Sequence, residues 1–198
     1  MSLYRFGVVT PTVADRGVLL KRCRRSIDWQ WRNDVRHIVY GDGFTPESPV
    51  GAVAFIDRSG RDRKGHDPLI GNDIRNKAVQ EWADKVDLFV FVDDDNILLP
   101  GALNRFEKAA APVVLSRMLE ISTDGRQRIY PKPEDARLIE GNFGSLQICV
   151  ASEIAKDCRF TPDRYNGDWD FIQQALAIAG REAKAIEDIT GIWCREGV

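Results

Sequence analysis

Three adjacent carboxylates, Asp93, Asp94 and Asp95, are the residues of this sequence whose types and spacing point most directly to chemistry. They follow the apolar run 88–92, so they stand where a buried strand would emerge at its carboxyl end, the edge at which open α/β sheets bind ligands. Adjacent acids repel one another, and a cation or hydrogen-bond donors must offset their charge. Carboxylate oxygens suit a hard divalent ion such as Mg²⁺ or Mn²⁺, which would in turn bridge phosphate oxygens. Two interpretations stay open from these residues alone, a metal and diphosphate site or an acidic turn that caps the following helix.

The elements that must position this cluster alternate along the chain. Runs of β-type residues predict strands over residues 5–10, 35–40, 52–56, 88–92, 113–121, 144–150 and 183–189. Apolar residues at helical spacing predict helices over 73–85, over 171–179, after Pro100, and after Asp15, the expected N-cap of the first helix. Strands that alternate with helices indicate an α/β fold with a mostly parallel sheet flanked by helices.

Three segments between these elements carry further expectations. The first strand is expected to stop at Pro11, which has no amide hydrogen to donate to a sheet ladder. The polar stretch 57–72 is rich in Gly, Asp, Arg and Lys and predicts a surface loop. Residues 123–133 have the composition of an exposed hairpin.

The composition is that of an ordinary globular protein. With 198 residues, 43% of them hydrophobic and 29% charged, the chain can build one full core, and we expect a single domain over residues 1–198. A formal net charge of −2 argues against a general polyanion binder, so the basic run at 21–25 is interpreted as a solvated helix face and no nucleic-acid partner is expected. The apolar runs fall far short of the roughly 20 residues that a transmembrane helix needs.

The cysteines and histidines do not predict a zinc site. The four cysteines are scattered without a C-x-x-C pair, and the chain has only two histidines. Because no secretory leader is recognisable, we expect reduced thiols in a cytoplasmic protein.

Several short motifs, taken in order, resemble those of the family 2 glycosyltransferases of the GT-A fold. Residues 8–12 are similar to the family's opening strand and donor-binding turn, and residues 41–43 are similar to its Asp-Asp-Gly motif. Residues 71–78 look like the segment in which Ala-Arg-Asn opens the helix before the metal strand. Residues 91–95 match the Asp-x-Asp signature, and residues 167–171 resemble the acidic motif at the start of a late helix. The resemblance covers nearly the whole chain and implies a single-domain GT-A-like fold related to the Rossmann fold.

The resemblance also implies a role for each matched residue. The residues expected to bind the donor are Thr10, Pro11, Thr12, Asp42, Arg75, Asn76, Asp93, Asp94 and Arg195. Among them, Asp42 would contact the base or ribose, Arg75 would face the donor, and Asn76 would help to fix the loop. Asp95 is expected to be the most direct ligand of Mn²⁺ or Mg²⁺, and Asp93 would lie nearer the ribose and sugar while also reaching the metal.

The implied reaction moves a sugar from a nucleoside diphosphate donor, by default a uridine diphosphate sugar, to a hydroxyl on a glycan or other macromolecule. The divalent ion would stabilise the charge on the leaving oxygen. The attacking hydroxyl needs a general base, for which Asp168 is expected and Asp170 is the second choice. Attack from the face opposite the leaving group would invert the anomeric carbon. Residues 1–100 would bind the donor, and residues 101–198 would form the acceptor side.

The sequence departs from the family pattern at two places. Many relatives carry Glu-Asp where this chain has Gly167-Asp168, so only one of the paired acids remains. The C-terminal segment 192–197 lacks the histidine that often contacts the diphosphate, and Arg195 would act as the charge clamp instead.

Three alternatives stay open. Asp168 could simply cap its helix. The motif Asp93-x-Asp95 also resembles the nucleophile motif of haloacid dehalogenase phosphatases, although at least three strands precede it here. The missing acid at Gly167 would also suit a non-catalytic module that binds nucleotide sugars or glycans.

Overall fold

A computed structural model describes residues 4–42, 44–46, 52–57, 70–132, 143–162 and 166–194, and for residues 52–57 and 70 only the backbone. The strands are β1 (Tyr4–Thr12), β2 (Val35–Asp42), β3 (Ala52–Asp57), β4 (Val86–Phe91), β5 (Ile97–Leu98), β6 (Val113–Ile121), β7 (Gln127–Tyr130), β8 (Ile148–Ala151) and β9 (Lys184–Cys194). The α-helices are α1 (Gly17–Asp28), α2 (Ile70–Trp82), α3 (Ala102–Ala109), α4 (Ser152–Ala155) and α5 (Gly167–Ala179). Short 3-10 turns are η1 (Ala14–Arg16), η2 (Ser145–Gln147) and η3 (Gly180–Glu182).

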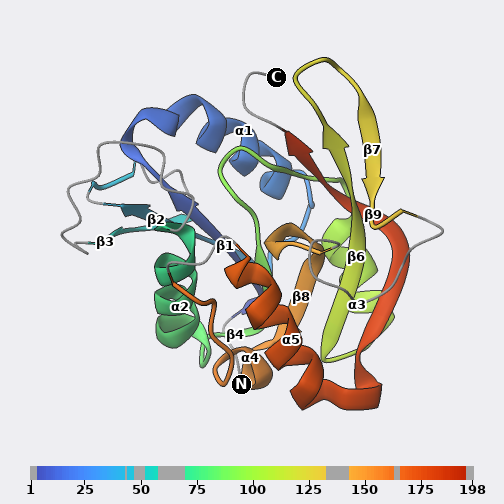
Figure 1. The fold of residues 1–198 in the computed structure, drawn as a ribbon. Helices are drawn as coiled ribbons and strands as arrows, with labels where there is room; N and C mark the ends of the chain where they lie inside the picture. The colour runs from blue at the N-terminus through green and yellow to red at the C-terminus, as the bar shows by residue number, and fades with distance from the viewer. Residues whose placement is uncertain are drawn as a thin grey trace.

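All of these strands join one continuous sheet (Figure 1). Its order is β3-β2-β1-β4-β8-β6-β9-β5, and β7 pairs with the far end of β6. The first four strands in this order are parallel, as predicted. Beyond β4 the directions mix, because β8 runs antiparallel to both β4 and β6 while β9 is parallel to β6. The parallel half brings the carboxyl ends of β1, β2 and β4 to one edge of the sheet.

Helices cover both faces of the sheet (Figure 1). On one face, side chains of α2, α4 and α5 form a buried cluster with β4, β6 and β8. On the other face, α1 and α3 pack against β1, β4 and β6. Within the first cluster Phe160 stacks on Phe171 at a centroid distance of 4.1 Å and meets the ring of Phe91 edge-on at 4.9 Å. This aromatic contact holds α5 beside the end of β4, where the acidic run begins.

The first strand runs through Pro11 to Thr12, so the expectation that it stops at the proline is wrong. Alternate residues of a strand turn their backbone groups to the same side, and Val9 accepts a hydrogen bond from Val92 on the β4 side. Pro11 therefore faces the β4 side as well, where the pairing with β4 has already ended at Val9. The missing amide hydrogen of Pro11 costs no ladder bond.

The first helix also differs from its prediction. It begins at Gly17 after the turn η1, its N-cap position is Arg16 rather than Asp15, and no side chain caps it. Leu20, Cys23 and Ile27 are buried as their spacing predicts, but Val18 is 82% exposed. At 100° per residue Val18 lies about 180° around the helix axis from Ile27, so it is on the face opposite the buried stripe.

Most other predictions of local structure are confirmed within a few residues. Strand β6 has the predicted bounds, and β6 and β7 form the expected exposed hairpin around Gly125, whose φ is +78°. The predicted strand 144–150 begins as η2 and becomes extended only at Ile148. Residues 58–69 of the predicted loop lie outside the described residues, and 70–72 already belong to α2. Across the described ranges, the helices are too short or too polar to cross a membrane.

Candidate functional site

Asp94 points into the protein at the carboxyl edge of the sheet. Its side chain is 1% exposed, and its Oδ2 accepts a 2.6 Å hydrogen bond from the hydroxyl of Thr12 at the end of β1. Arg16 Nη1 lies 2.9 Å from Asp94 Oδ1, although this buried oxygen accepts no well-directed hydrogen bond. Asp94 therefore ties the loop after β4 to the turn after β1.

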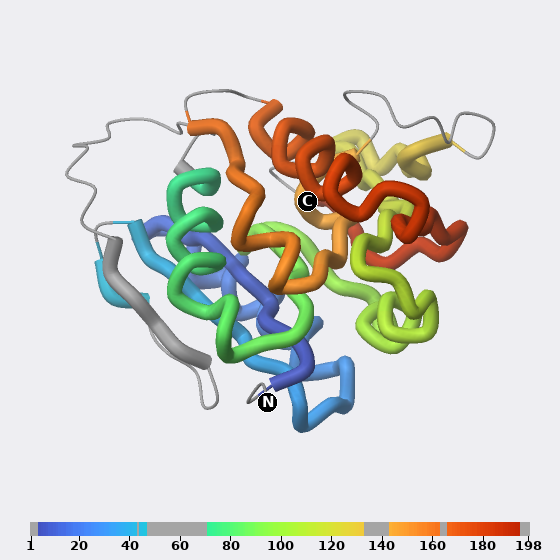
Figure 2. Tube along the Cα trace, turned by 90° about the horizontal axis from the view of Figure 1, so that it is seen from below, coloured from blue at the N-terminus to red at the C-terminus, as the bar shows by residue number. Residues whose placement is uncertain are grey.

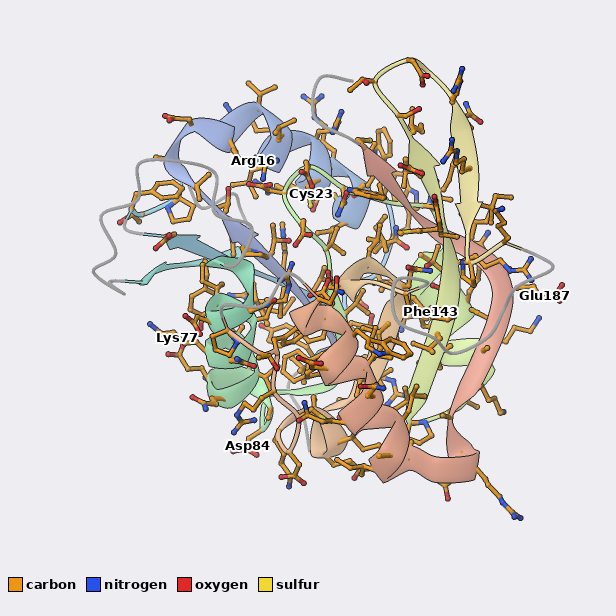
Figure 3. The ribbon with its side chains drawn as sticks, viewed as in Figure 1. Arg16, Cys23, Lys77, Asp84, Phe143 and Glu187 are labelled. Carbon is orange, nitrogen blue, oxygen red and sulfur yellow. The ribbon has the colours of Figure 1, made fainter. Side chains whose placement is uncertain are left out.

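Arg16 contacts two of the three acids and offsets part of their charge. Besides Asp94, it pairs with Asp95 Oδ2 at 2.6 Å, and the neighbouring Arg22 donates a 2.8 Å hydrogen bond to the backbone oxygen of Asp95. Figure 3 labels Arg16 in the turn between β1 and α1. No motif in the sequence points to Arg16 as a site residue. Its position four residues after Thr12 is the one hint in the sequence, because it places Arg16 near the carboxyl ends of the strands, where the acids lie.

The acids retain an electrostatic cost despite these contacts. Burial raises the pKa of Asp94 to about 7; the bond from Thr12 and the charge of Arg16 oppose this shift, and Asp95 and Asp93 add to it. Burial and the neighbouring Asp93 also raise the pKa of Asp95. Additional positive charge at this loop would therefore stabilise the ionised carboxylates.

Arg75 of α2 joins the acidic loop to the start of α5. It is 5% exposed, forms a close ion pair with Asp93, and lies 3.7 Å from Asp168 Oδ1. It also donates a 3.0 Å hydrogen bond to Asn72 and lies over the ring of Phe160, 5.5 Å from the centroid. Burial lowers the pKa of Arg75, but Asp93 and Asp168 outweigh it, so the pKa is raised and the guanidinium stays charged.

Asp168 lies in the first turn of α5 and faces Arg75. The helix begins at Gly167 and its N-cap position is Asn166, so the alternative that Asp168 caps the helix is wrong. Its Oδ2 accepts a 3.0 Å hydrogen bond from the amide of Ser145, which fixes the carboxylate while the side chain stays 29% exposed. Asp170 is two positions farther along, about 200° around the helix axis, and so projects from a different face.

Gly167 leaves no room for the second acid of the motif that the sequence resembles. A Cβ at this position would lie 2.3 Å from Asn72 Nδ2 and 2.5 Å from the backbone oxygen of Thr161. Asn72 occupies that space because its amide donates a 2.9 Å hydrogen bond to the same oxygen. The departure at Gly167 is therefore coupled to Asn72, the neighbour of Arg75.

The other predicted donor-side residues lie around this centre. The hydroxyl of Thr10 is buried against His37 Nε2 at 2.9 Å, so only its backbone can face a ligand. Asn76 pairs with the backbone of Phe160 in both directions, at 2.8 and 2.9 Å, and so fixes the segment before α5. Asp42 ends β2, on the opposite side of β1 from the acidic loop. Gly43 and Arg195 lie outside the described residues.

The acidic loop suits a metal ion that takes few ligands from the protein. Within the ranges the structure describes, no three His, Cys, Asp or Glu side chains gather as a metal-binding group. Asp93 and Asp95 nevertheless keep 33% and 18% of their side chains exposed, and both offer carboxylate oxygens. Mg²⁺ is commonly held by one or two carboxylates together with phosphate oxygens and water. These residues therefore fit a divalent ion whose remaining ligands come from a diphosphate.

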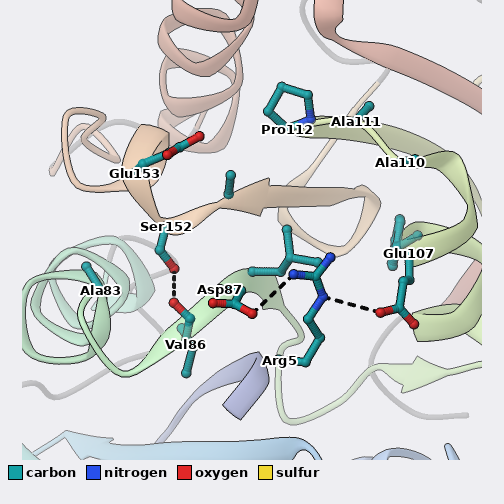
Figure 4. A pocket seen from close by; sticks show the side chains of 13 residues that line it. Arg5, Ala83, Val86, Asp87, Glu107, Ala110, Ala111, Pro112, Ser152 and Glu153 are labelled. Carbon is teal, nitrogen blue, oxygen red and sulfur yellow. Dashed lines mark hydrogen bonds and ion pairs between the residues drawn. The ribbon is translucent and has the colours of Figure 1, made fainter. Parts of the chain in front are cut away.

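A cavity of about 540 Å³ lies at the opposite edge of the sheet (Figure 4). Arg5 lies between Asp87 at 3.1 Å and Glu107 at 3.3 Å, and Ser152 donates a 2.7 Å hydrogen bond to the backbone of Val86. None of the predicted site residues lines this cavity. The predicted site residues therefore lie away from this cavity.

The sequence itself matches no family model and no curated protein. The structure, in contrast, is similar to that of S. aureus TarS 1-349 in complex with UDP-GlcNAc, with a TM-score of 0.72 and 16% identity over 98% of this chain. The same protein in complex with UDP gives a TM-score of 0.72 at 14% identity, and TarS itself gives 0.70 at 13%. This chain spans 60% of the length of TarS 1-349 and 37% of that of TarS. The likeness confirms the predicted class, an α/β domain with a GT-A-like fold.

Proposed function

We propose that this chain is a glycosyltransferase that moves a sugar from a nucleoside diphosphate donor to a hydroxyl acceptor. The observation that carries the proposal is the bridge made by Arg75, which holds Asp93 and Asp168 on two sides of one buried guanidinium at the ligand-binding edge of a GT-A-like sheet. A donor-side acid and a prospective base, 75 residues apart, thus share one centre. The UDP-GlcNAc bound to TarS supports a uridine diphosphate sugar as the donor.

In the proposed reaction the acceptor oxygen forms a bond to the anomeric carbon as its proton passes to Asp168. The bond from that carbon to the diphosphate oxygen breaks, and the oxygen leaves with the electron pair, so the product is inverted. Asp95 and Asp93 would hold Mg²⁺ or Mn²⁺, which supplies Lewis acidity at the leaving diphosphate. Arg16 and Arg75 would offset part of the charge of the acidic loop before the donor arrives.

The test measures donor binding and donor hydrolysis separately with UDP-GlcNAc as the probe, with and without Mn²⁺. We expect Asp95→Asn to weaken Mn²⁺-dependent donor binding. Asp168→Asn should keep binding but lower turnover by about 100-fold or more, as the loss of a general base does. The matched control is Asp87→Asn, an acid paired with Arg5 at the far edge of the sheet. Unchanged turnover in Asp168→Asn would refute its role as base.

One second candidate has an observation in its favour. The space at Gly167 excludes a paired acid, as in a binding module that holds a nucleotide sugar without turning it over. Tight donor binding by the wild-type chain with no hydrolysis and no transfer to any hydroxyl acceptor would favour that module. An aspartyl-phosphate on Asp93 would instead indicate the phosphatase chemistry that its motif also resembles.

A further inference from the structure

The outer face of α1 carries an exposed stripe of apolar and basic side chains. Val18, Lys21, Arg25 and Trp29 are spaced by three or four residues, so they lie within a narrow arc of the helix surface. Val18 is 82% exposed and Trp29 is 54% exposed, while the opposite side of α1 packs into the core. Trp31 follows just past the helix and is 87% exposed. We call these five residues the α1 stripe.

Trp31 is 87% exposed and lies in the turn that follows α1. Its φ is +53°, in the left-handed region that residues other than glycine rarely adopt. Its neighbours are fixed, because the Gln30 amide donates a 2.9 Å hydrogen bond to the backbone of Leu99 and Arg32 pairs with Asp34 and Glu107 at 2.6 and 2.7 Å. The segment between α1 and β2 projects from the body of the molecule (Figure 2). The fixed turn therefore holds an exposed tryptophan beside the end of α1.

The positive charge of the stripe favours a negatively charged partner surface. The chain carries a net charge of −2, yet four basic residues fall within 21–25, and both Lys21 and Arg25 are exposed. Tryptophan rings favour the interface between lipid headgroups and acyl chains, and lysine and arginine beside them attract anionic headgroups. We propose that the α1 stripe docks this protein on an anionic lipid bilayer surface.

A second copy of the chain fits the stripe less well. A symmetric dimer would place the stripe against itself and bring the Lys21 and Arg25 side chains of both copies into one interface, where like charges repel. Five side chains also fall well short of the roughly 20–30 residues that each partner contributes to a stable interface. The stripe begins two residues after Arg16, so a bound bilayer would lie close to the acidic loop.

The experiment measures partition of the full chain onto vesicles of phosphatidylcholine alone and of phosphatidylcholine mixed with phosphatidylglycerol. We expect binding only to the mixed vesicles, with a blue shift of tryptophan fluorescence and a loss of binding at high salt. Lys21→Gln with Arg25→Gln should weaken binding about 25-fold, since each basic residue near such a surface contributes about fivefold. Trp29→Ala with Trp31→Gly should weaken it about tenfold.

Two control variants test whether the effect is specific to the stripe. Ile178→Ser removes an exposed apolar side chain from α5, and Arg126→Gln removes an exposed charge from the β6–β7 hairpin; neither should change binding. Trp31→Gly should melt no lower than the wild type, because glycine relieves the positive φ. The proposal is overturned if the wild type ignores the mixed vesicles, if the stripe variants bind as it does, or if the stripe instead mediates a concentration-dependent dimer.

Discussion

Replacing Arg75 by methionine tests whether one guanidinium holds the candidate site together. Methionine keeps the unbranched stem and the contact with Phe160 but removes the charge that Asp93 and Asp168 share. The variant leaves these two acids without their common cation. We expect a loss of folding stability and a weaker affinity for any diphosphate donor.

The size of the stability loss follows from the exposure of the partners. Removing one partner of a fully buried ion pair costs about 3–5 kcal/mol. Asp93 and Asp168 are 33% and 29% exposed, so water offsets part of that cost, and we expect about 2–3 kcal/mol. For a chain of this length, each kcal/mol lowers the melting temperature by about 2–4 °C, which gives a fall of roughly 4–12 °C.

Urea unfolding of a double-mutant cycle isolates the interaction itself. Arg75→Met, Asp93→Asn and the double variant should give a coupling energy of about 1–2 kcal/mol. Arg5→Met is the matched control, since Arg5 also joins two acids but all three side chains are 40% exposed; it should cost less than about 1 kcal/mol. A coupling energy near zero, or an equal loss in both arginine variants, would refute the idea that Arg75 is the bridge.

Two further predictions concern residues beside the site. Burial, and to a smaller extent the charge of Arg24, lowers the pKa of His37 from 6.5 to about 3. Between these two pH values the unfolded chain binds a proton that the folded chain does not. The wild type therefore loses stability as the pH falls from about 6.5 towards 3. Relative to His37→Gln, it should lose about 1.4 kcal/mol between pH 7.5 and 5.5 in urea unfolding, and an equal pH dependence of both proteins would contradict this. Gly167→Ala should lower the free energy of unfolding by about 1–3 kcal/mol, because the added Cβ meets Asn72 and Thr161. Gly17→Ala is the control, since it has open space around it and should be neutral or slightly stabilising. Similar melting temperatures for the two variants would count against the crowding at Gly167.

The sequence by itself determined the local elements and the place of the acidic run. A run of β-type residues defines β6 with the observed bounds, and helical spacing predicts the buried Leu20, Cys23 and Ile27 of α1. The run Asp93–Asp95 follows a strand in the structure as it does in the pattern. These features depend on neighbours a few residues apart, which a sequence shows directly.

Only the tertiary structure decided which of these residues meet. Arg16 reaches Asp95 across 79 positions, and Thr12 reaches Asp94 across 82, because the parallel pairing of β1 and β4 brings both strand ends to one edge. The antiparallel β8 and the crowding of Gly167 by Asn72 likewise depend on contacts between distant segments. Periodicity records whether a side chain is buried, but not what it is buried against. The carboxylates were therefore visible in the sequence. Their pairing with Arg16 and Arg75 depends on how the strand ends pack. The same packing buries Asp94 and leaves Asp93 and Asp95 accessible.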